Sequence, residues 1–240
     1  MGGYLLQLEE LFLTRIQKAD HLLLVGAKTP VQDAAAIETG SLEEGIISSA
    51  RQDGVSILFK ADISEFEIRH LLKGVYGFRK EKPIMHMYFR LEAFDVETGT
   101  MLYSGFRKGD LTIDGDVKEK EYLQQHKTPP PELADSAIKD LVDEAAEALE
   151  NVPWKGFVAE VADDHISFSA GNDVGLKVGD MLEVRGRGEK VVNFAGATYL
   201  PPGNKTGIIR IETVGETTST GMIEEGSAVQ RGDTLVLIKE

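Results

Sequence analysis

The stretch Gly175-Leu-Lys-Val-Gly179-Asp180, followed directly by Met181-Leu-Glu-Val184, decides the fold of the C-terminal part of the chain. The arrangement recurs as Gly226-Ser-Ala-Val-Gln-Arg-Gly232-Asp233, followed by Thr234-Leu-Val-Leu-Ile238. Glycine adopts positive φ without a Cβ clash, and an aspartate side chain accepts hydrogen bonds from nearby backbone amides. We therefore predict two tight turns that each start a strand, and we assign these glycines and aspartates to turns before any chemistry.

Short alternating runs surround these turns and predict a small all-β barrel-like domain over residues 153–240. Asp163-Asp164 is expected to form the first hairpin turn. The expected strands lie near residues 156–162, 165–169, 181–186, 190–193, 206–215 and 234–239.

The preceding residues, 1–152, predict an α/β domain with a mixed sheet and packed helices, so that the whole chain is of the α+β class. Residues 4–19 carry an apolar stripe at helical spacing, formed by Leu5, Leu8, Phe12, Ile16 and Ala19. A short strand is expected at residues 21–25. Ser41 opens a second helix with Glu44 in a capping box, and Gly54 ends it.

The expected sheet begins with a long strand from Val55 to Arg69, with a bulge or bend after Ile63 where the apolar phase flips. A hairpin over residues 84–106 follows, its inner face formed by alternating Met85, Met87, Phe89, Leu91 and Ala93 and its turn by Asp95–Gly99. Residues 107–131 are expected to be a flexible segment. A helix with apolar Leu133, Ala137, Leu141, Ala145 and Leu149 then runs to the boundary at Pro153.

Composition excludes several classes of function. The 240 residues carry a net charge of −14, and the acidic excess holds on both sides of residue 150, so nucleic acid is not expected as a partner. The chain has no cysteine, which removes disulfides and thiolate chemistry. No apolar run approaches the roughly 20 residues that span a bilayer, and Met1-Gly2-Gly3 leads into a helix rather than a signal peptide.

Clustered acids are the first candidates for a site. Asp110, Asp114 and Asp116 crowd one segment and would suit calcium, but their spacing does not match an EF-hand loop. Asp163, Asp164 and Asp173 are better explained as turn residues. We therefore predict no metal site and no cofactor.

The histidines offer no catalytic pattern. His21, His70, His86, His126 and His165 are scattered, and no pair has the spacing of a helical zinc site. His86 is expected on the polar face of its strand. No Gly-x-Ser-x-Gly motif is present, and we predict no catalytic residues.

Three further features have structural explanations. Gly186-Arg-Gly188 lacks the lysine and helix of a phosphate loop. Arg231-Gly232-Asp233 spells an integrin-type tripeptide, but its aspartate already starts a strand. Trp154 and Phe157 are expected to pack the end of the preceding helix against the barrel.

The hairpin Phe89-Arg-Leu-Glu-Ala-Phe-Asp95-Val-Glu-Thr-Gly99-Thr-Met-Leu-Tyr-Ser104 resembles a turn found in the flagellar assembly protein T family and, more distantly, in the curli secretion pore family. The run Ala50 to Ile63 looks like the helix-to-strand step of their α/β domains. The C-terminal residues, with their two Gly-Asp turns, are similar to the C-terminal barrel of flagellar assembly protein T. The N-terminal domain of that family and its first strand have no counterpart here.

The resemblance implies a non-enzymatic periplasmic protein, associated peripherally with the outer membrane, that assembles a flagellar ring or a surface appendage through contacts with other protein subunits or with itself. The strand near 206–215 and the loop 195–205 are the expected contact surfaces. A periplasmic module that binds a small ligand or glycan is the alternative. A hydrolase that uses the carboxylates at 110–116 is a third hypothesis.

Overall fold

The computed structural model describes residues 2–19, 22, 44–64, 67–73, 80–112, 131–192 and 198–238. The chain divides into two compact units. The helix–sheet unit comprises Met1–Ala27, Lys60–Glu92 and Tyr103–Glu150, and the barrel unit comprises Lys28–Phe59, Ala93–Leu102 and Asn151–Glu240. Each unit therefore gathers segments that are far apart in the sequence.

Two helices belong to the helix–sheet unit, α1 (Gly2–Lys18) and α4 (Glu132–Leu149), and they pack on each other. The stripe predicted on α1 is confirmed by the burial of Leu8, Phe12 and Ile16; the Leu5 side chain lies outside the described residues. Arg15 of α1 pairs with Asp135 of α4 at 2.6 Å. The five apolar residues predicted to form the inner stripe of α4 are all buried. No described helix is both long and apolar enough to span a membrane.

The barrel unit contains the remaining described helix, α2 (Glu44–Gln52). Gly54 follows it with φ of 74°, as the predicted C-terminal cap requires. Ser41 and the predicted strand at 21–25 lie outside the described residues, apart from Leu22, which is neither helix nor strand.

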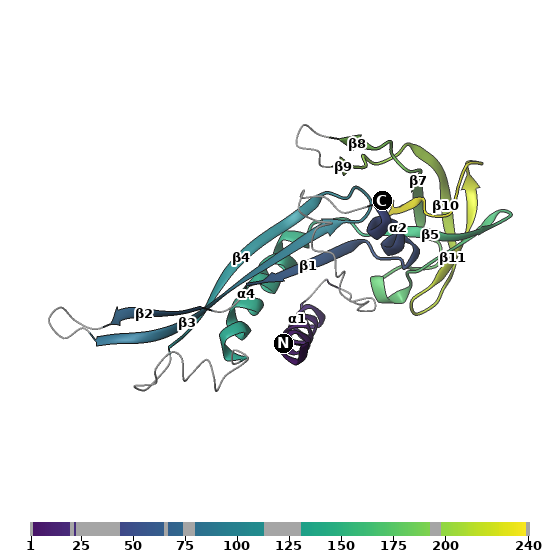
Figure 1. Ribbon diagram of the computed structural model, residues 1–240. Helices are drawn as coiled ribbons and strands as arrows, with labels where there is room; N and C mark the ends of the chain where they lie inside the picture. Colours follow the sequence, from purple (N-terminus) through teal and green to yellow (C-terminus); the bar gives the residue numbers. More distant parts are fainter. Residues whose placement is uncertain are drawn as a thin grey trace. The chain divides into compact units, whose positions relative to one another are not determined.

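A four-stranded sheet is built around β3 (Lys80–Asp95), with which β1 (Ile57–Ile63), β2 (Glu67–Lys73) and β4 (Met101–Thr112) all pair. Figure 1 shows β3 and β4 running side by side as a long hairpin. Its turn confirms the prediction: Gly99 has φ of 70°, and the Asp95 carboxylate accepts hydrogen bonds from the amides of Glu97 and Thr98.

The predicted bulge between β1 and β2 is confirmed by their register on β3. The Ser64 amide donates to the Tyr88 carbonyl at 3.0 Å, and β2 resumes with Glu67 opposite His86. Three residue steps on one strand thus match two on the other, which is the count of a β-bulge. The expected single strand consequently consists of two segments, and Phe66 lies outside the described residues.

Two expectations about this hairpin were wrong. β4 extends to Thr112, so residues 107–112 belong to a strand and not to a flexible segment; residues 113–130 lie outside the described residues. The face of β3 opposite the predicted apolar set is partly buried, because His86, Glu92 and Phe94 are buried there while Arg90 is exposed. Pattern alone placed His86 on a polar face because a histidine alternates there with methionines.

The barrel is closed by six strands in the order β10-β11-β6-β5-β12-β7. These strands are β5 (Lys155–Ala162), β6 (His165–Phe168), β7 (Met181–Arg185), β10 (Lys205–Val214), β11 (Ser219–Glu225) and β12 (Thr234–Leu237). Fully buried apolar residues from these strands fill its interior: Phe168, Leu182, Val184, Ile209, Ile211 and Leu235. The predicted α+β fold with a small barrel is confirmed.

The repeated Gly-Asp turns behave as the sequence predicts. Gly179 and Gly232 have φ of 93° and 84°. The Asp180 carboxylate accepts the amide of Lys177 at 2.9 Å, and the Asp233 carboxylate accepts the amide of Gln230 at 2.9 Å. The two aspartates thus make the same contact, three residues back, immediately before a strand.

The strand near 206–215, which the sequence indicates as a contact surface, is β10 of the barrel. β10 pairs with β11 on one side and β7 on the other, so it presents no free edge. β11, which completes this pairing, was not predicted because its sequence, Ser-Thr-Gly-Met-Ile-Glu-Glu, is mostly polar. Outside the barrel, β8 (Val191–Val192) and β9 (Thr198–Tyr199) form a separate two-stranded ribbon.

Gly109 of β4 is a point of close approach between sheet and helix in the helix–sheet unit. A Cβ atom at this position would overlap the backbone carbonyl of Leu133 in α4 and come within 3.2 Å of the Phe89 ring. Backbone cannot move aside as a flexible side chain can, so the start of α4 depends on the absence of a side chain here.

We therefore expect Gly109→Ala to lower the free energy of unfolding by about 1–3 kcal/mol, the usual cost of overpacking. Gly45→Ala is the matched control, because Gly45 is helical and a Cβ there meets nothing within 4 Å; it should raise stability by about 0.5 kcal/mol. Urea unfolding followed by circular dichroism measures both. Equal stability of Gly109→Ala and the parent would contradict the close contact.

Candidate functional site: an arginine-lined hollow in the barrel unit

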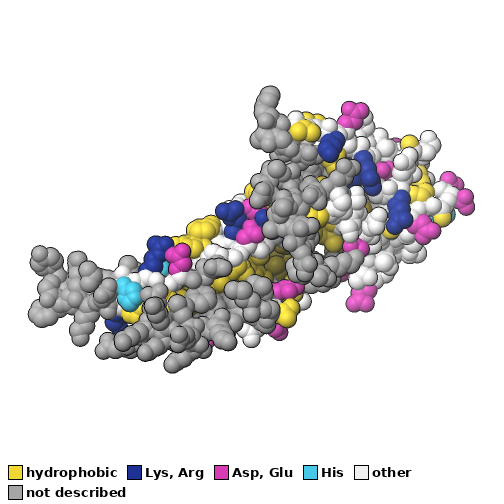
Figure 2. All heavy atoms as spheres, in the orientation of Figure 1, with side chains coloured by type: hydrophobic (Ala, Val, Ile, Leu, Met, Phe, Trp, Pro, Cys, Tyr) yellow, Lys and Arg dark blue, Asp and Glu magenta, His cyan; other side chains and the backbone are white. Residues whose placement is uncertain are grey.

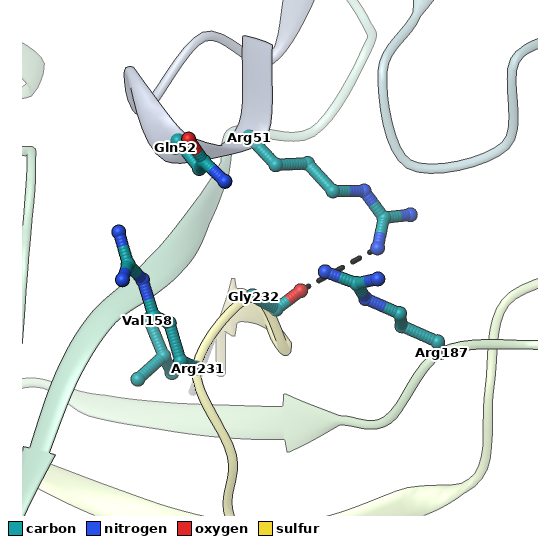
Figure 3. A pocket seen from close by; sticks show the side chains of 6 residues that line it. All are labelled: Arg51, Gln52, Val158, Arg187, Arg231 and Gly232. Carbon is teal, nitrogen blue, oxygen red and sulfur yellow. Dashed lines mark hydrogen bonds between the residues drawn. The ribbon is translucent and has the colours of Figure 1, made fainter. Parts of the chain in front are cut away.

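A hollow of about 130 Å³ lies in the barrel unit beside the turn that precedes β12. Its lining comes from the end of α2, from β5, from the segment after β7 and from the turn itself, namely Arg51, Gln52, Val158, Arg187, Arg231 and Gly232 (Figure 3). Three of these six residues are arginines, which is unusual in a chain of net charge −14.

Arg51 is the buried member of the three, with 5% of its surface exposed. Its guanidinium donates to the carbonyls of Glu97 at 2.6 Å and of Val96 and Gly232 at 3.4 Å. The group also lies over the Phe157 ring, 5.4 Å from its centroid. One side chain thus connects α2, the β3–β4 turn and the turn before β12.

The charged state of Arg51 is disfavoured by burial. Burial lowers the pKa of Arg51, the neighbouring charge of Arg187 lowers it further, and Glu97, Asp95 and Asp233 act in the opposite direction. Arginine nevertheless stays charged in proteins, because its ordinary pKa lies far above neutral pH. The carboxylates around it therefore offset part of the desolvation penalty.

A second cation, the half-buried Lys155 of β5, lies against two of these carboxylates. Its ammonium lies 2.6 Å from Asp95 and 2.6 Å from Glu97, although the Glu97 contact lacks hydrogen-bond geometry. Burial alone would lower the pKa of Lys155, but the hydrogen bond to Asp95 and the charges of Asp95 and Glu97 outweigh it, and the pKa is raised. The β3–β4 turn is thus bound to the barrel strand by charge as well as by Arg51.

Asp233 behaves differently from these acids. Its pKa is raised because burial disfavours the carboxylate, and this effect outweighs the hydrogen bonds from Gln230 and Thr206 and the charges of Arg187 and Arg51. The ionised form of Asp233 is therefore destabilised by burial at the start of β12, and the hydrogen bond from the Gln230 amide offsets part of this destabilisation.

Gly232 separates Asp233 from the hollow. Its carbonyl accepts the hydrogen bond from Arg51, and a Cβ built on it would lie 2.6 Å from Arg187 Nη2. In Figure 3 the side chains of Arg187 and Arg231 lie on opposite sides of Gly232. The hollow is consequently lined by one buried guanidinium, that of Arg51, and by two exposed ones.

The structure separates the acids that were considered as metal ligands. Asp110 lies in β4, where it hydrogen-bonds His86 at 2.5 Å and pairs with Lys108 at 3.0 Å; Asp114 and Asp116 lie outside the described residues. Burial would raise the pKa of Asp110, but His86 and Lys108 outweigh it and the pKa is lowered. Within the described ranges, no three histidine or acidic side chains come together as a metal would require.

The remaining aspartates serve turns. Asp163 has φ of 52° between β5 and β6, and the backbone carbonyl of Asp164 accepts the Ile223 amide. The Asp173 carboxylate accepts the amides of Gly171 and Val174, which holds the short 3-10 helix Asn172–Val174. Asp163 and Asp173 are exposed. These contacts are those expected of turn residues.

The described histidines have ordinary surroundings. His86 is 2% exposed and bonded to Asp110, so its predicted place on a polar face was wrong while its expected satisfied state was right. His70 is exposed, and His165 is exposed and pairs with Glu212 at 3.3 Å. His21 and His126 lie outside the described residues.

The two aromatic residues around the start of β5, the buried Phe157 and the partly buried Trp154, have different surroundings. Phe157 packs with Ile47, Ala50, Phe94 and Val96, so its partners are α2 and the β3–β4 turn rather than the end of α4. Trp154 packs against the barrel core.

The Arg231-Gly232-Asp233 tripeptide is unsuited to binding an integrin, because its Asp233 is buried, with only 5% of its surface exposed.

Comparison with known proteins gives no family. No family model matches the sequence, and no curated protein matches it. Among solved structures, a hypothetical protein of Chlamydia trachomatis, CT253, is similar, at 14% identity and a TM-score of 0.42, over 60% of this chain and 83% of that one. A likeness this slight supports no argument about fold or function.

Sequence reasoning missed the hollow and its arginines. Arg51 sits in a short polar helix ending, Ser-Ala-Arg-Gln, that gives no sign of burial. One feature of the sequence could have indicated the hollow: Arg187 and Arg231 each have a glycine as sequence neighbour, in Gly186-Arg-Gly188 and Arg231-Gly232. A glycine has no side chain and so leaves room for a guanidinium.

The raised pKa of Asp233 gives a pH prediction. A group whose pKa is higher in the folded state stabilises the fold fully below its ordinary pKa of 3.8, and this contribution is lost as pH rises through the folded value. Asp233→Asn cannot ionise but keeps an oxygen that can accept the Gln230 amide. The stability of this variant relative to the parent should therefore increase between pH 3.5 and pH 7. Urea unfolding across that range measures it, with Asp180→Asn as control; a constant difference for Asp233→Asn would contradict the raised pKa.

Proposed function

We propose that this chain is a non-enzymatic assembly or scaffold protein that works by protein–protein contact, in the periplasm near the outer membrane, within a flagellar ring or a surface-appendage secretion system. The location and the system come from the resemblance of the β3–β4 hairpin and the C-terminal turns. The mode of action is supported by the ribbon of β8 and β9.

The ribbon exposes several large apolar side chains to solvent, which is unfavourable unless a partner covers them. Val192 is 57% exposed, and Val191 and Tyr199, which lie opposite each other, are each 37% exposed. Among the described strands, β8 and β9 pair only with each other. Figure 2 shows apolar side chains at the surface in the region of this ribbon. An isolated pair of strands is marginally stable, so pairing with a strand of another subunit would stabilise it.

The base of the ribbon is fixed to the rest of the barrel unit. The Leu200 amide donates to the Thr98 carbonyl at 2.8 Å, and the Leu200 side chain packs against the Phe157 cluster. An anchored base limits the entropy lost when the ribbon binds a partner. The ribbon falls partly within the loop 195–205 that the sequence indicates as a contact surface.

The alternative, a module for small ligands or glycans, finds less support. The arginine-lined hollow measures about 130 Å³, whereas sites for ligands of drug size are typically about 300–1,000 Å³. A sugar chain would exceed it.

Sedimentation tests the proposal. The parent protein should show a sedimentation coefficient that rises with concentration, and Val192→Asp should abolish this rise, because a carboxylate in a newly formed apolar contact is strongly disfavoured. Val178→Asp is the control, since Val178 is 66% exposed but lies in a turn of the barrel rather than in the ribbon.

Equal self-association of the parent and Val192→Asp would contradict the role of the ribbon. A parent that stays monomeric and gains a large, saturable rise in Tm with a glycan would favour the alternative instead, because only a ligand that binds the native state stabilises it in this way.

A further inference from the structure

We propose that the hollow lined by Arg51, Arg187 and Arg231 binds a phosphate group, either free phosphate or the phosphate of a small monoester. This binding is independent of the proposed assembly function, because the ribbon of β8 and β9 takes no part in it.

The first argument is charge. The positive charge of Arg51 is opposed by Asp95, Glu97 and Asp233. Arg187 and Arg231 are exposed, and within the described part of the chain neither forms an ion pair within 4 Å or a side-chain hydrogen bond. Most other described arginines do have an acidic partner, as Arg185 has Glu183 and Arg210 has Glu224. Two positive charges beside the hollow are thus left for an incoming dianion.

The second argument is direction. The three arginines come from α2, from the segment after β7 and from the turn before β12; in Figure 3 the guanidiniums of Arg51 and Arg187 lie near each other, and the Arg231 side chain lies on the other side of Gly232. A planar carboxylate presents two oxygens in one plane, whereas a phosphate presents oxygens in three or four directions. Arginine forks bind phosphate oxygens in pairs. Donors distributed in this way favour the tetrahedral anion.

The third argument is preorganisation and size. Arg51 is already fixed by three carbonyl acceptors, so its guanidinium loses no further freedom on binding. Gly232 has no side chain, and a methyl group there would displace Arg187. A hollow of about 130 Å³ accommodates one such group and leaves the remainder of a monoester in solvent.

Titration calorimetry and thermal unfolding of the full chain test the proposal with sodium phosphate, glycerol 3-phosphate and acetate, each against sodium chloride at equal ionic strength. We expect saturable binding of phosphate and a matching rise in Tm. Arg187→Gln should weaken phosphate binding by about tenfold or more, as loss of a charged hydrogen-bonding partner of about 1.5–3 kcal/mol implies. Arg231→Gln serves as a second variant.

Arg210→Gln is the matched control, because Arg210 is an exposed arginine of β10 that pairs with Glu224 and lies outside the lining of the hollow; it should bind phosphate like the parent. Tighter binding of glycerol 3-phosphate than of phosphate would identify a monoester as the ligand, and the reverse would identify free phosphate. Val192→Asp should bind phosphate normally, which separates this proposal from the assembly function.

Three results would overturn the proposal: no saturable binding of either phosphate, an equal response to acetate, or an equal loss in Arg210→Gln. The first would mean that the exposed arginines are only solvated. The second would favour a planar carboxylate site, and the third would indicate attraction by overall charge.

Discussion

The contact of the Arg51 guanidinium with the carbonyls of Glu97 and Gly232 is the interaction on which the barrel unit depends. It connects α2, the tip of the β3–β4 hairpin and the final turn of the barrel, which are far apart in the sequence. Buried charge is costly unless it is paired and hydrogen-bonded. Here three backbone carbonyls accept the hydrogen bonds of Arg51, the nearby carboxylates of Asp95 and Glu97 are themselves paired with Lys155, and Phe157 covers the guanidinium. The barrel unit is thus stabilised both by the apolar core of the barrel and by a polar network around Arg51.

The sequence predicted those parts of the fold that local chemistry determines. The turns at Asp95–Gly99 and the two Gly-Asp positions follow from glycine at positive φ and from carboxylates that accept backbone amides, and the Asp163-Asp164 turn has Asp163 itself at positive φ. The stripes of α1 and α4 follow from helical periodicity. β11 escaped prediction because its residues are mostly polar and its place is set by pairing with β10 and β6. The burial of His86 also depends on a partner, Asp110, from another strand.

The candidate site was not predictable for the same reason. Arg51, Arg187 and Arg231 occupy three unrelated stretches of sequence, and only the closure of the barrel and the packing of α2 bring them to one hollow. Once together, they contrast with a protein surface that is acidic overall. The ribbon of β8 and β9 offers a different chemistry: it exposes apolar side chains, and its two strands pair with each other and with no other described strand. The chain therefore carries one surface suited to an anion and another suited to a protein strand.

Native-state hydrogen exchange of Arg51→Met tests the role of Arg51 most directly. The amides of Val55, Gly99 and Gly232 report on the three connected segments. The account predicts that all three lose protection together, by about 2 kcal/mol or more, because the variant leaves buried carbonyls unpaired, while Arg231→Met leaves them unchanged. Loss of protection at Val55 alone, or at none of the three, would contradict the claim that one buried arginine unites them.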